Sequence, residues 1–421
     1  MFTQISLSSI PLGSKFSTAV FDDRRTKLIA AGIEVTPQLV DSLRKRSVDK
    51  IVVSASDVAR FEAFQPQGKS RSALVEHQPY SSPLENEHSR ELDRLIQDAL
   101  DCTMRGDENP LSDRIRRHGA VPLDPHFKQM LSERNERNVI EFGTMSTSCV
   151  RGAGLNFELI GKISSEVVDS MIEDIDALVG LGVNPYKDSY PSRHSQHATM
   201  LSLSIGVSLG LNERSLKKLG MGCLIHDIGM LAVDRRMYET KDVLEPGDFV
   251  EITKHPLRTF DIIEKNIENV SLAARLVAYQ MHERCNGTGY PRRRPTAQIH
   301  PMARLAAVAD AYVALVTPRP HRPGMLPHFA MAKIVKDVSS GRLDPKVVRA
   351  LLETTSLFPL GSYVSLGNDY VGRVIRANGC NYTKPIVEVW KQGNLSAPPS
   401  IVDLANDSTL IIEKPLASLS S

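Results

Sequence analysis

The sequence has few of the residues on which nucleic-acid-binding proteins depend. Aromatic residues make up 5% of the 421 residues, and there is one tryptophan, which argues against a stacking platform for single-stranded nucleic acid. The 51 basic residues are balanced by 49 acidic ones, which leaves a net charge of +2. A nucleic-acid-binding surface needs clustered positive charge, so no nucleic-acid polymer is expected as a partner.

Cysteines and long apolar runs are also scarce. The five cysteines are scattered and odd in number, with no pair spaced as Cys-x-x-Cys, so neither a disulfide framework nor a cysteine-based zinc site is expected. The best apolar segment, 200–211, is interrupted by serine and glycine and is shorter than a membrane span. The N-terminus has no basic segment followed by an apolar one. We therefore expect a cytoplasmic protein with no membrane contact.

The chain is long enough for two or three domains. Residues 1–65 are predicted to form a small α/β accessory domain, with strands at 19–21 and 50–53 and a helix over 36–43. Residues 66–160 are polar and are predicted to be a linker with some helix, around 92–100. The charged residues up to 156 show no clear pattern.

A helical period dominates residues 161–355, which are predicted to form one helical domain. Short β-type runs follow in 356–421 and predict a small β-module, with strands near 363–366, 371–375, 385–389 and 410–412. The predicted fold class is mainly α: a helical metal-binding bundle with a small N-terminal α/β unit and a small C-terminal β-module. The expected helices span 165–181, 192–211, 213–226, 248–254, 257–266, 272–282, 301–315 and 327–338.

The helical region holds six residues that bind transition metals well, mostly one helix and loop apart. In a bundle, such spacing can bring one ligand from each successive helix to a single centre. A mixture of imidazole and carboxylate ligands suits iron, manganese, zinc or nickel better than calcium or magnesium. The six are His194, His226, Asp227, His255, His282 and Asp310.

The adjacent His226 and Asp227 give the sharpest signal. Asp227 continues the apolar stripe of its predicted helix, and a buried carboxylate must be paired or must hold a metal. Asp310 lies in the same way on a helix face rich in alanine. A single histidine on an apolar face is more often a core residue, and a single buried aspartate is more often a cap or an ion-pair partner. Spacing alone therefore leaves both interpretations open.

The order of these residues resembles a known family, the HD-GYP branch of the HD superfamily. Tyr190 to Ser195, then His226 to Gly229, then Lys254 to Pro256, are similar to its successive ligand motifs. His282 to Arg284 followed by Gly287 to Pro291 resembles the segment that names the branch, and Val308 to Asp310 with Arg319 to Arg322 resembles its closing segment. The similarity covers about 130 residues.

The resemblance implies a helical domain that hydrolyses cyclic di-GMP, a bacterial second messenger, to a linear product. It implies one to three divalent transition-metal ions, with iron or manganese favoured, held by the six residues above. Asp227 falls at the bridging carboxylate and is the catalytic candidate, while Arg319, Arg322 and Tyr290 fall at positions that contact the substrate. A second copy of the chain or a signalling protein is the expected protein partner.

Four positions depart from the family pattern. Met230 replaces a lysine, Met281 replaces the first of two adjacent histidines, Asn286 replaces an aspartate, and Tyr190 stands where some members carry a glutamate. A thioether is a weak ligand for ferrous or manganous ions, and methionine offers no charge to a phosphate. Two functions therefore stay open: a phosphodiesterase, impaired at Met230 and Met281, or a degenerate domain that binds a nucleotide or a partner without turnover.

Overall fold

The computed structural model describes residues 2–6, 10, 14–21, 27–30, 32–33, 35–36, 39–40, 43, 48, 50–54 and 57–58, and then 87–97, 105–186, 190–239, 246–320 and 322–419. The chain separates into two compact units, Met1–Pro79 and Tyr80–Ser421. Among the described residues, no helix has the length and apolar character that crossing a membrane requires.

The first unit contains a four-stranded antiparallel sheet with the order β1-β4-β2-β3. Ile51 and Val53 alternate with more exposed residues and are fully buried, as the two-residue period of a strand requires. Strands are therefore confirmed at two predicted places, whereas the helix expected over 36–43 lies partly outside the described residues. The strands are β1 (Phe2–Ser6), β2 (Val20–Phe21), β3 (Lys27–Ile29) and β4 (Lys50–Ser54).

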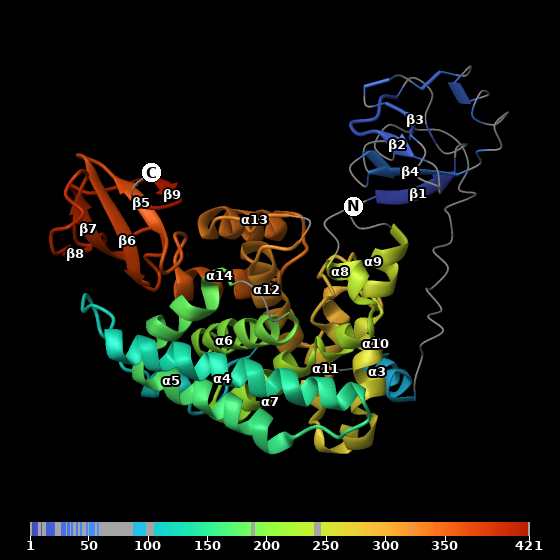
Figure 1. The fold of residues 1–421 in the computed structure, drawn as a ribbon, viewed down its shortest axis with the longest axis horizontal. Helices are drawn as coiled ribbons and strands as arrows, with labels where there is room; N and C mark the ends of the chain where they lie inside the picture. Colours follow the sequence, from blue (N-terminus) through green and yellow to red (C-terminus); the bar gives the residue numbers. More distant parts are fainter. Residues whose placement is uncertain are drawn as a thin grey trace. The chain divides into compact units, whose positions relative to one another are not determined.

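The second unit is built around a helical bundle (Figure 1). Five predicted helices begin at the expected residues: α6 (Ser192–Ser208), α7 (Glu213–Ile225), α11 (Leu272–Gln280), α12 (Pro301–Val316) and α13 (Pro327–Ser339). Further helices of the bundle are α5 (Phe157–Val183), α9 (Pro246–Ile252), α10 (His255–Ile263) and α14 (Pro345–Thr355).

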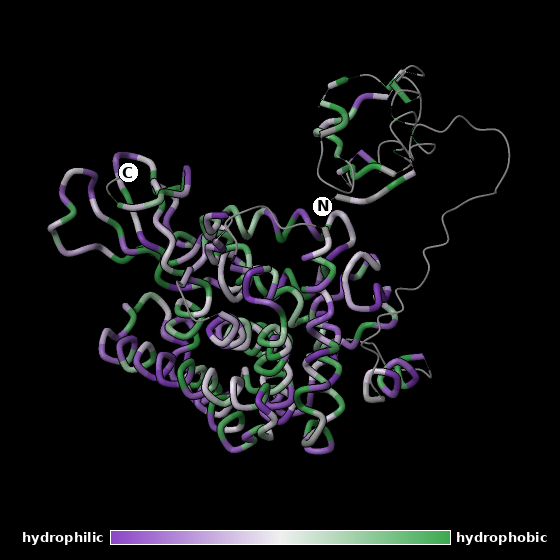
Figure 2. Tube along the Cα trace, turned by 45° about the vertical axis from the view of Figure 1, so that its right-hand side comes forward, coloured by the Kyte–Doolittle hydropathy of each residue, from purple (hydrophilic) through white to green (hydrophobic). Residues whose placement is uncertain are grey.

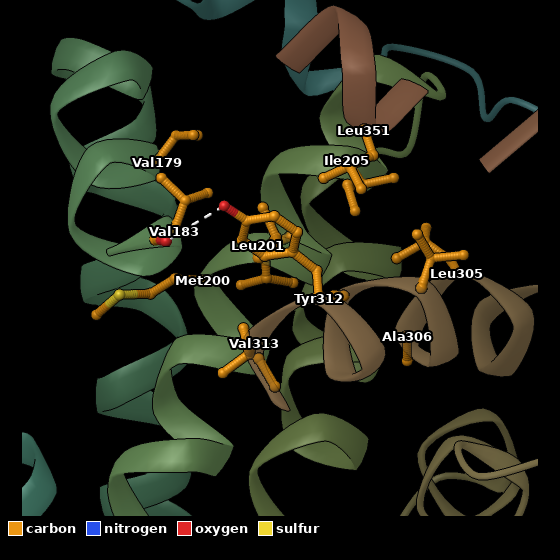
Figure 3. Packing of buried hydrophobic residues seen from close by; sticks show 14 of the residues in the cluster. Val179, Val183, Met200, Leu201, Ile205, Leu305, Ala306, Tyr312, Val313 and Leu351 are labelled. Carbon is orange, nitrogen blue, oxygen red and sulfur yellow. Dashed lines mark hydrogen bonds between the residues drawn. The ribbon is translucent and has the colours of Figure 1, made fainter. Parts of the chain in front are cut away.

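Helix α6 lies at the centre of the bundle, since every described residue from His194 to Val207 is buried. It packs against α5, α7 and α12. Figure 3 shows this packing: Val179 and Val183 of α5 face Leu201 of α6 and Tyr312 of α12. The Tyr312 hydroxyl donates to the Val183 carbonyl at 3.4 Å, which satisfies its polar end inside the core.

Helix α4 (Pro125–Val150) occupies a charged part of the chain in which no clear periodic pattern was found. Asp124 caps its first turn and accepts from the His126 amide at 2.9 Å, and Pro125 occupies the first helical position. Leu131 and Phe142 are buried against the bundle, while much of the helix is polar and exposed (Figure 2). Its weak apolar periodicity explains why it was not predicted.

The chain ends in a five-stranded antiparallel sheet with the order β8-β7-β6-β5-β9. Strand β8 was not among the predicted strands. Arg376 at the end of β6 is buried and donates to Asp174 and Asp176 of α5 at 2.9–3.0 Å, which fastens the sheet to the bundle. The strands are β5 (Tyr363–Leu366), β6 (Tyr370–Arg376), β7 (Ile386–Lys391), β8 (Ser400–Asp403) and β9 (Ile412–Leu416).

Candidate metal centre

The fold brings all six predicted ligands together from different elements. His194 comes from α6, His226 from the end of α7, His255 from the start of α10, His282 from the residues just after α11, and Asp310 from α12. Asp227 begins the short 3-10 helix η3 (Ile228–Ala232). All six side chains are at least nine-tenths buried, so their polar atoms have little access to bulk water.

One carboxylate oxygen of Asp227 is the centre of the first half of the site. Its Oδ1 atom lies 3.1 Å from Nε2 of His255, 3.3 Å from Nε2 of His226 and 3.6 Å from Nε2 of His282. The Nε2 atoms of His255 and His282 are themselves 3.0 Å apart. Three imidazole nitrogens thus converge on one buried oxygen.

Asp310 is the centre of the second half. Its Oδ1 lies 2.9 Å from Nε2 of His194 and 4.0 Å from Nε2 of His226, and its Oδ2 lies 3.3 Å from Nδ1 of His282. His226 and His282 therefore connect the two halves. The ligand atoms form two groups that could each hold an ion, His194–His226–Asp310 and His226–Asp227–His282.

The unsatisfied atoms of the site fit a metal ion. His226 Nε2 and Asp227 Oδ1 are buried and have no hydrogen-bond partner among the described residues, a condition that normally costs stability. The other ring nitrogen of His226, Nδ1, donates to the Cys223 carbonyl at 2.7 Å, and Nδ1 of His255 lies 2.8 Å from the Ile252 carbonyl. Such contacts fix the tautomer that leaves Nε2 free to bind a metal.

Burial and charge set the protonation of these groups. Burial lowers the pKa of His226 to about 4, so this imidazole is neutral. Burial opposes the ionisation of Asp227 and Asp310, but the neighbouring imidazoles hold the pKa of each carboxyl well below its usual value. Burial also opposes protonation of His282, yet Asp310 and Asp227 raise its pKa to about 9. The site therefore favours ionised carboxylates and positive charge near them.

Gly229 is required by the approach of α10. A Cβ atom at this position would lie 2.1 Å from the His255 carbonyl oxygen and 2.7 Å from the Thr259 amide nitrogen. The Gly229 amide donates to the Thr259 hydroxyl at 3.0 Å, and that hydroxyl also contacts the His226 carbonyl at 3.1 Å. The lack of a side chain at Gly229 therefore lets α10 approach closely enough for His255 to reach Asp227.

The loop of residues 286–295 places Tyr290 against the ligands. The Tyr290 ring stacks on His282 with the ring centres 4.8 Å apart, and its amide donates to the His282 carbonyl at 3.2 Å. Buried Glu283 accepts from the amides of Arg292 and Arg294 at 2.7 and 3.0 Å. A Cβ on Gly289 would lie 2.3 Å from the Arg284 amide nitrogen, so the loop can close only with glycine there.

Two predicted substrate residues, Arg319 and Arg322, have different surroundings. The Arg319 guanidinium lies over the Tyr190 ring, 4.2 Å from its centre, and makes no hydrogen bond with the described residues. The Arg322 guanidinium donates to the Ala314 carbonyl at 2.5 Å and has longer contacts, 3.4–3.5 Å, with three further carbonyls near the end of α12. Arg319 is therefore available to a ligand, whereas Arg322 binds the backbone.

Tyr190 connects Arg319 with the ligands. Its hydroxyl donates to Oδ2 of Asp227 at 3.2 Å, so the two oxygens of this carboxylate face different groups. Tyr190 departs from the family pattern, and no role is predicted for it from the sequence. No sequence signal showed that its hydroxyl would reach Asp227.

The other departures lie in well-packed surroundings. Met230 and Met281 are buried, and Met281 belongs to the main hydrophobic core with Val277 and Cys223. The Asn286 side chain accepts from the Thr288 hydroxyl at 2.7 Å and donates to the Ser340 carbonyl at 3.0 Å. Whether the two methionines impair the site stays a prediction.

Comparison with known proteins agrees with this arrangement. Residues 186–347 match the family model described as HD domain. The chain is 28% identical over 255 residues to cyclic di-GMP phosphodiesterase PA4108 of Pseudomonas aeruginosa, covering 60% of this chain and 61% of the relative. It is 29% identical over 189 residues to 3'3'-cGAMP-specific phosphodiesterase 1 of Vibrio cholerae, covering 44% and 43%. The chain thus spans less than two thirds of these relatives' length.

A solved structure described as Bd1817, a HDG"Y"P protein from Bdellovibrio bacteriovorus, aligns with 83% of this chain and 98% of its own, at 15% identity and a TM-score of 0.42. The family match covers all six predicted ligand positions, and the relatives in the preceding paragraph are named for phosphodiesterase activity. Residues 186–347 are therefore similar to HD domains.

Proposed function

We propose that the protein is a metal-dependent phosphodiesterase that hydrolyses cyclic di-GMP to a linear product. The observation that carries the proposal is the convergence of three imidazole nitrogens within 3.6 Å of the otherwise unpartnered Oδ1 atom of Asp227. The names of the relatives give the class of substrate.

The six ligands would hold one to three divalent transition-metal ions, with iron or manganese favoured by the nitrogen and oxygen donors. Such ions supply Lewis acidity toward a phosphate oxygen and lower the pKa of water. Asp227 is the catalytic candidate because Oδ1 faces the imidazoles while Oδ2 is held by the Tyr190 hydroxyl at 3.2 Å. This hydrogen bond fixes the carboxylate before substrate arrives.

Arg319 would bind a phosphate oxygen of the substrate. Its guanidinium is oriented by the Tyr190 ring and keeps its N–H groups free of the described residues, and a planar guanidinium suits a phosphate better than an ammonium does. The positive guanidinium of Arg319 would stabilise the negative charge that develops on the phosphate during hydrolysis. Arg322 was predicted to share this role, and its hydrogen bonds to the backbone make Arg319 the stronger candidate.

Two aromatic side chains beside the ligands fit the bases of a cyclic dinucleotide. Tyr290 stacks on His282, and the ring of Phe249 meets Tyr290 edge-on with the ring centres 6.4 Å apart. Phe249 is exposed although it is large and apolar. An aromatic face next to a phosphate site suits a purine base, since stacking does not depend on hydrogen bonding.

The test combines metal analysis with hydrolysis. Purified protein loaded with manganese or iron should hydrolyse cyclic di-GMP, and 3'3'-cGAMP serves as the competing substrate. Asp227→Ala should lose metal and activity together, because it removes the oxygen that three imidazoles face. Asp234→Asn, which alters an exposed carboxylate paired with Arg236 at the surface, is the control.

Four outcomes separate the alternatives. Turnover of cyclic di-GMP supports the proposal, and turnover of 3'3'-cGAMP in its place corrects the substrate. Binding of cyclic di-GMP without turnover by metal-loaded protein contradicts the enzyme and supports the degenerate domain. Equal metal content in the wild type and Asp227→Ala would show that the metal lies elsewhere. A second copy of the chain or a signalling protein as partner stays a prediction.

A further inference from the structure

The loop that carries Tyr290 is held from two sides. From within the HD domain, Glu283 accepts the amides of Arg292 and Arg294, as described above. From outside the segment that matches the HD family, the side chains of the same two arginines reach one carboxylate, Asp93 of α3 (Glu87–Gln97). Nearly two hundred residues of sequence separate Asp93 from this loop.

The contacts of Asp93 form a compact network. Its Oδ2 accepts from Nε of Arg292 at 3.0 Å, and its Oδ1 accepts from Nη2 of Arg294 at 2.5 Å. The Tyr279 hydroxyl donates to the same Oδ1 at 3.0 Å and accepts from Nε of Arg292 at 2.9 Å. Hydrogen bonds between charged groups of this kind are stronger than neutral ones.

The network is shielded from solvent and rigidly supported. The side chains of Arg292 and Arg294 are 14% and 8% exposed, and that of Asp93 is 21% exposed. Leu92 and Ile96 of α3 are buried in a hydrophobic cluster with Phe260 and Tyr279. The helix is thus anchored through its apolar face, and Asp93 is presented to the loop at a fixed place.

Tyr279 extends the network toward the metal ligands. It lies on α11, three residues before His282, and its ring is fully buried against Phe260. Asp93 therefore joins α11, which leads to His282, with the loop that lays Tyr290 on His282. Removing the carboxylate would break one contact of each arginine side chain at once and weaken the attachment of the loop to α3 and α11.

We propose that Asp93 is a positioning residue for the site: through Arg292 and Arg294 it fixes the loop that holds Tyr290 against His282. Helix α3 lies outside residues 186–347 and precedes them in the sequence, so the complete site includes a helix that the family match does not cover. The consequence for substrate binding rests on the proposed function, whereas the consequence for the order of the loop does not.

The experiment uses the full-length protein and the substitution Asp93→Asn, which keeps the shape and removes the charge. Amide hydrogen exchange in residues 286–295 should become at least about tenfold faster, as expected for the loss of charged hydrogen bonds, with exchange in α6 and α12 unchanged. The control is Glu91→Gln on the same helix, whose exposed carboxylate lies 3.8 Å from Arg275 and does not contact the loop. It should leave exchange in 286–295 as in the wild type.

Kinetics give a second measurement. Asp93→Asn should raise KM for cyclic di-GMP several-fold with a smaller change in kcat, and Asp93→Glu should restore part of the loss because it restores the charge. Metal content should stay at the wild-type value. If neither wild type nor variant turns over cyclic di-GMP, the proposed function fails while the exchange measurement still decides the proposal.

Two results would overturn it. Exchange in residues 286–295 that is the same in Asp93→Asn and the wild type would show that Asp93 does not hold the loop. Exchange that accelerates equally throughout the helical bundle would show that Asp93 serves global stability and has no particular effect on the site. In the event that Asp93→Asn does not fold, Arg292→Gln, which removes one of the two arginine contacts from the loop side, replaces it.

Discussion

Arg319 and Arg322, the two arginines after α12, are expected to have different roles, and two matched substitutions test this difference. Arg319 and Arg322 are three residues apart, and each pairs its backbone with the other, since the Arg319 amide donates to the Arg322 carbonyl at 2.9 Å and the reverse bond is 3.0 Å. Their guanidinium groups differ: that of Arg319 lies on the Tyr190 ring, and that of Arg322 caps the end of α12. We expect Arg319→Ala to weaken substrate binding and Arg322→Ala to lower stability.

The magnitudes follow from these contacts. Loss of a charged hydrogen bond from Arg319 to a phosphate should weaken binding by about 1.5–3 kcal/mol, roughly tenfold or more. The thermal midpoint should change little, because the Arg319 guanidinium makes one cation–π contact with the Tyr190 ring, worth about 0.5–1 kcal/mol. For Arg322, one short hydrogen bond and a cation at a helix C-terminus together predict a loss of about 1–2 kcal/mol, a fall of a few degrees in the midpoint.

The assay is direct binding of cyclic di-GMP by calorimetry to the metal-loaded wild type and both variants, with thermal unfolding measured on the same preparations. The reasoning predicts weaker binding with an unchanged thermal midpoint for Arg319→Ala, and a lower midpoint with unchanged binding for Arg322→Ala. The reasoning fails if Arg319→Ala binds as tightly as the wild type. It also fails if Arg322→Ala loses affinity while its midpoint stays unchanged, because that pattern would place the substrate contact at Arg322.

Three further substitutions test other parts of the structure. Gly289→Ala should move the loop away, because its Cβ would lie 2.3 Å from the Arg284 amide nitrogen, and should reduce cyclic di-GMP affinity severalfold in folded protein; undiminished affinity would show that the position of Tyr290 does not matter. Met281→His should raise the metal-to-protein ratio and the rate, and a folded variant with no gain would show that Met281 serves only as core. Burial lowers the pKa of His197 to about 3. Since the folded value lies below the unfolded value of about 6.5, the protein should lose stability as pH falls from 6.5 toward 3, and His197→Leu should reduce the loss between pH 7.5 and pH 5 by about 2 kcal/mol. An identical pH dependence of urea unfolding in both proteins would contradict this.

The centre of the site could be predicted because its residues follow from chemistry that the sequence displays. Asp227 and Asp310 stand where apolar residues are expected, and a carboxylate in such a place must be paired or must bind a metal. Both are buried, as expected. The helices that carry them have strong starting signals, such as Asn212 before α7, whose side chain accepts from the Ser215 amide at 2.9 Å.

The periphery of the site could not be predicted, because its contacts depend on loop geometry. Nothing in the sequence near Asp93 indicates that it lies beside Arg292 and Arg294, and the run of arginines at 292–294 reads equally well as an exposed basic turn. The hydrogen bond of Tyr190 to Asp227 and the carbonyl contacts of Arg322 depend in the same way on where segments without a regular period fold back. Such contacts emerge only from the three-dimensional structure.

The two methionines at family motif positions, Met230 and Met281, pack as buried apolar side chains where the family has polar residues. Met281 is fully buried and packs in the same hydrophobic cluster as Val277 and Cys223, and Met230 is buried on the short helix η3 that follows Asp227. Each therefore contributes to stability through apolar burial at a place where a histidine or lysine would need a polar partner. The six predicted ligands lie close together although neither methionine is one of them. A site with these six residues and without the extra histidine should hold fewer metal ions than the family pattern implies. The metal-to-protein ratio therefore distinguishes a site with fewer ions from a site with none.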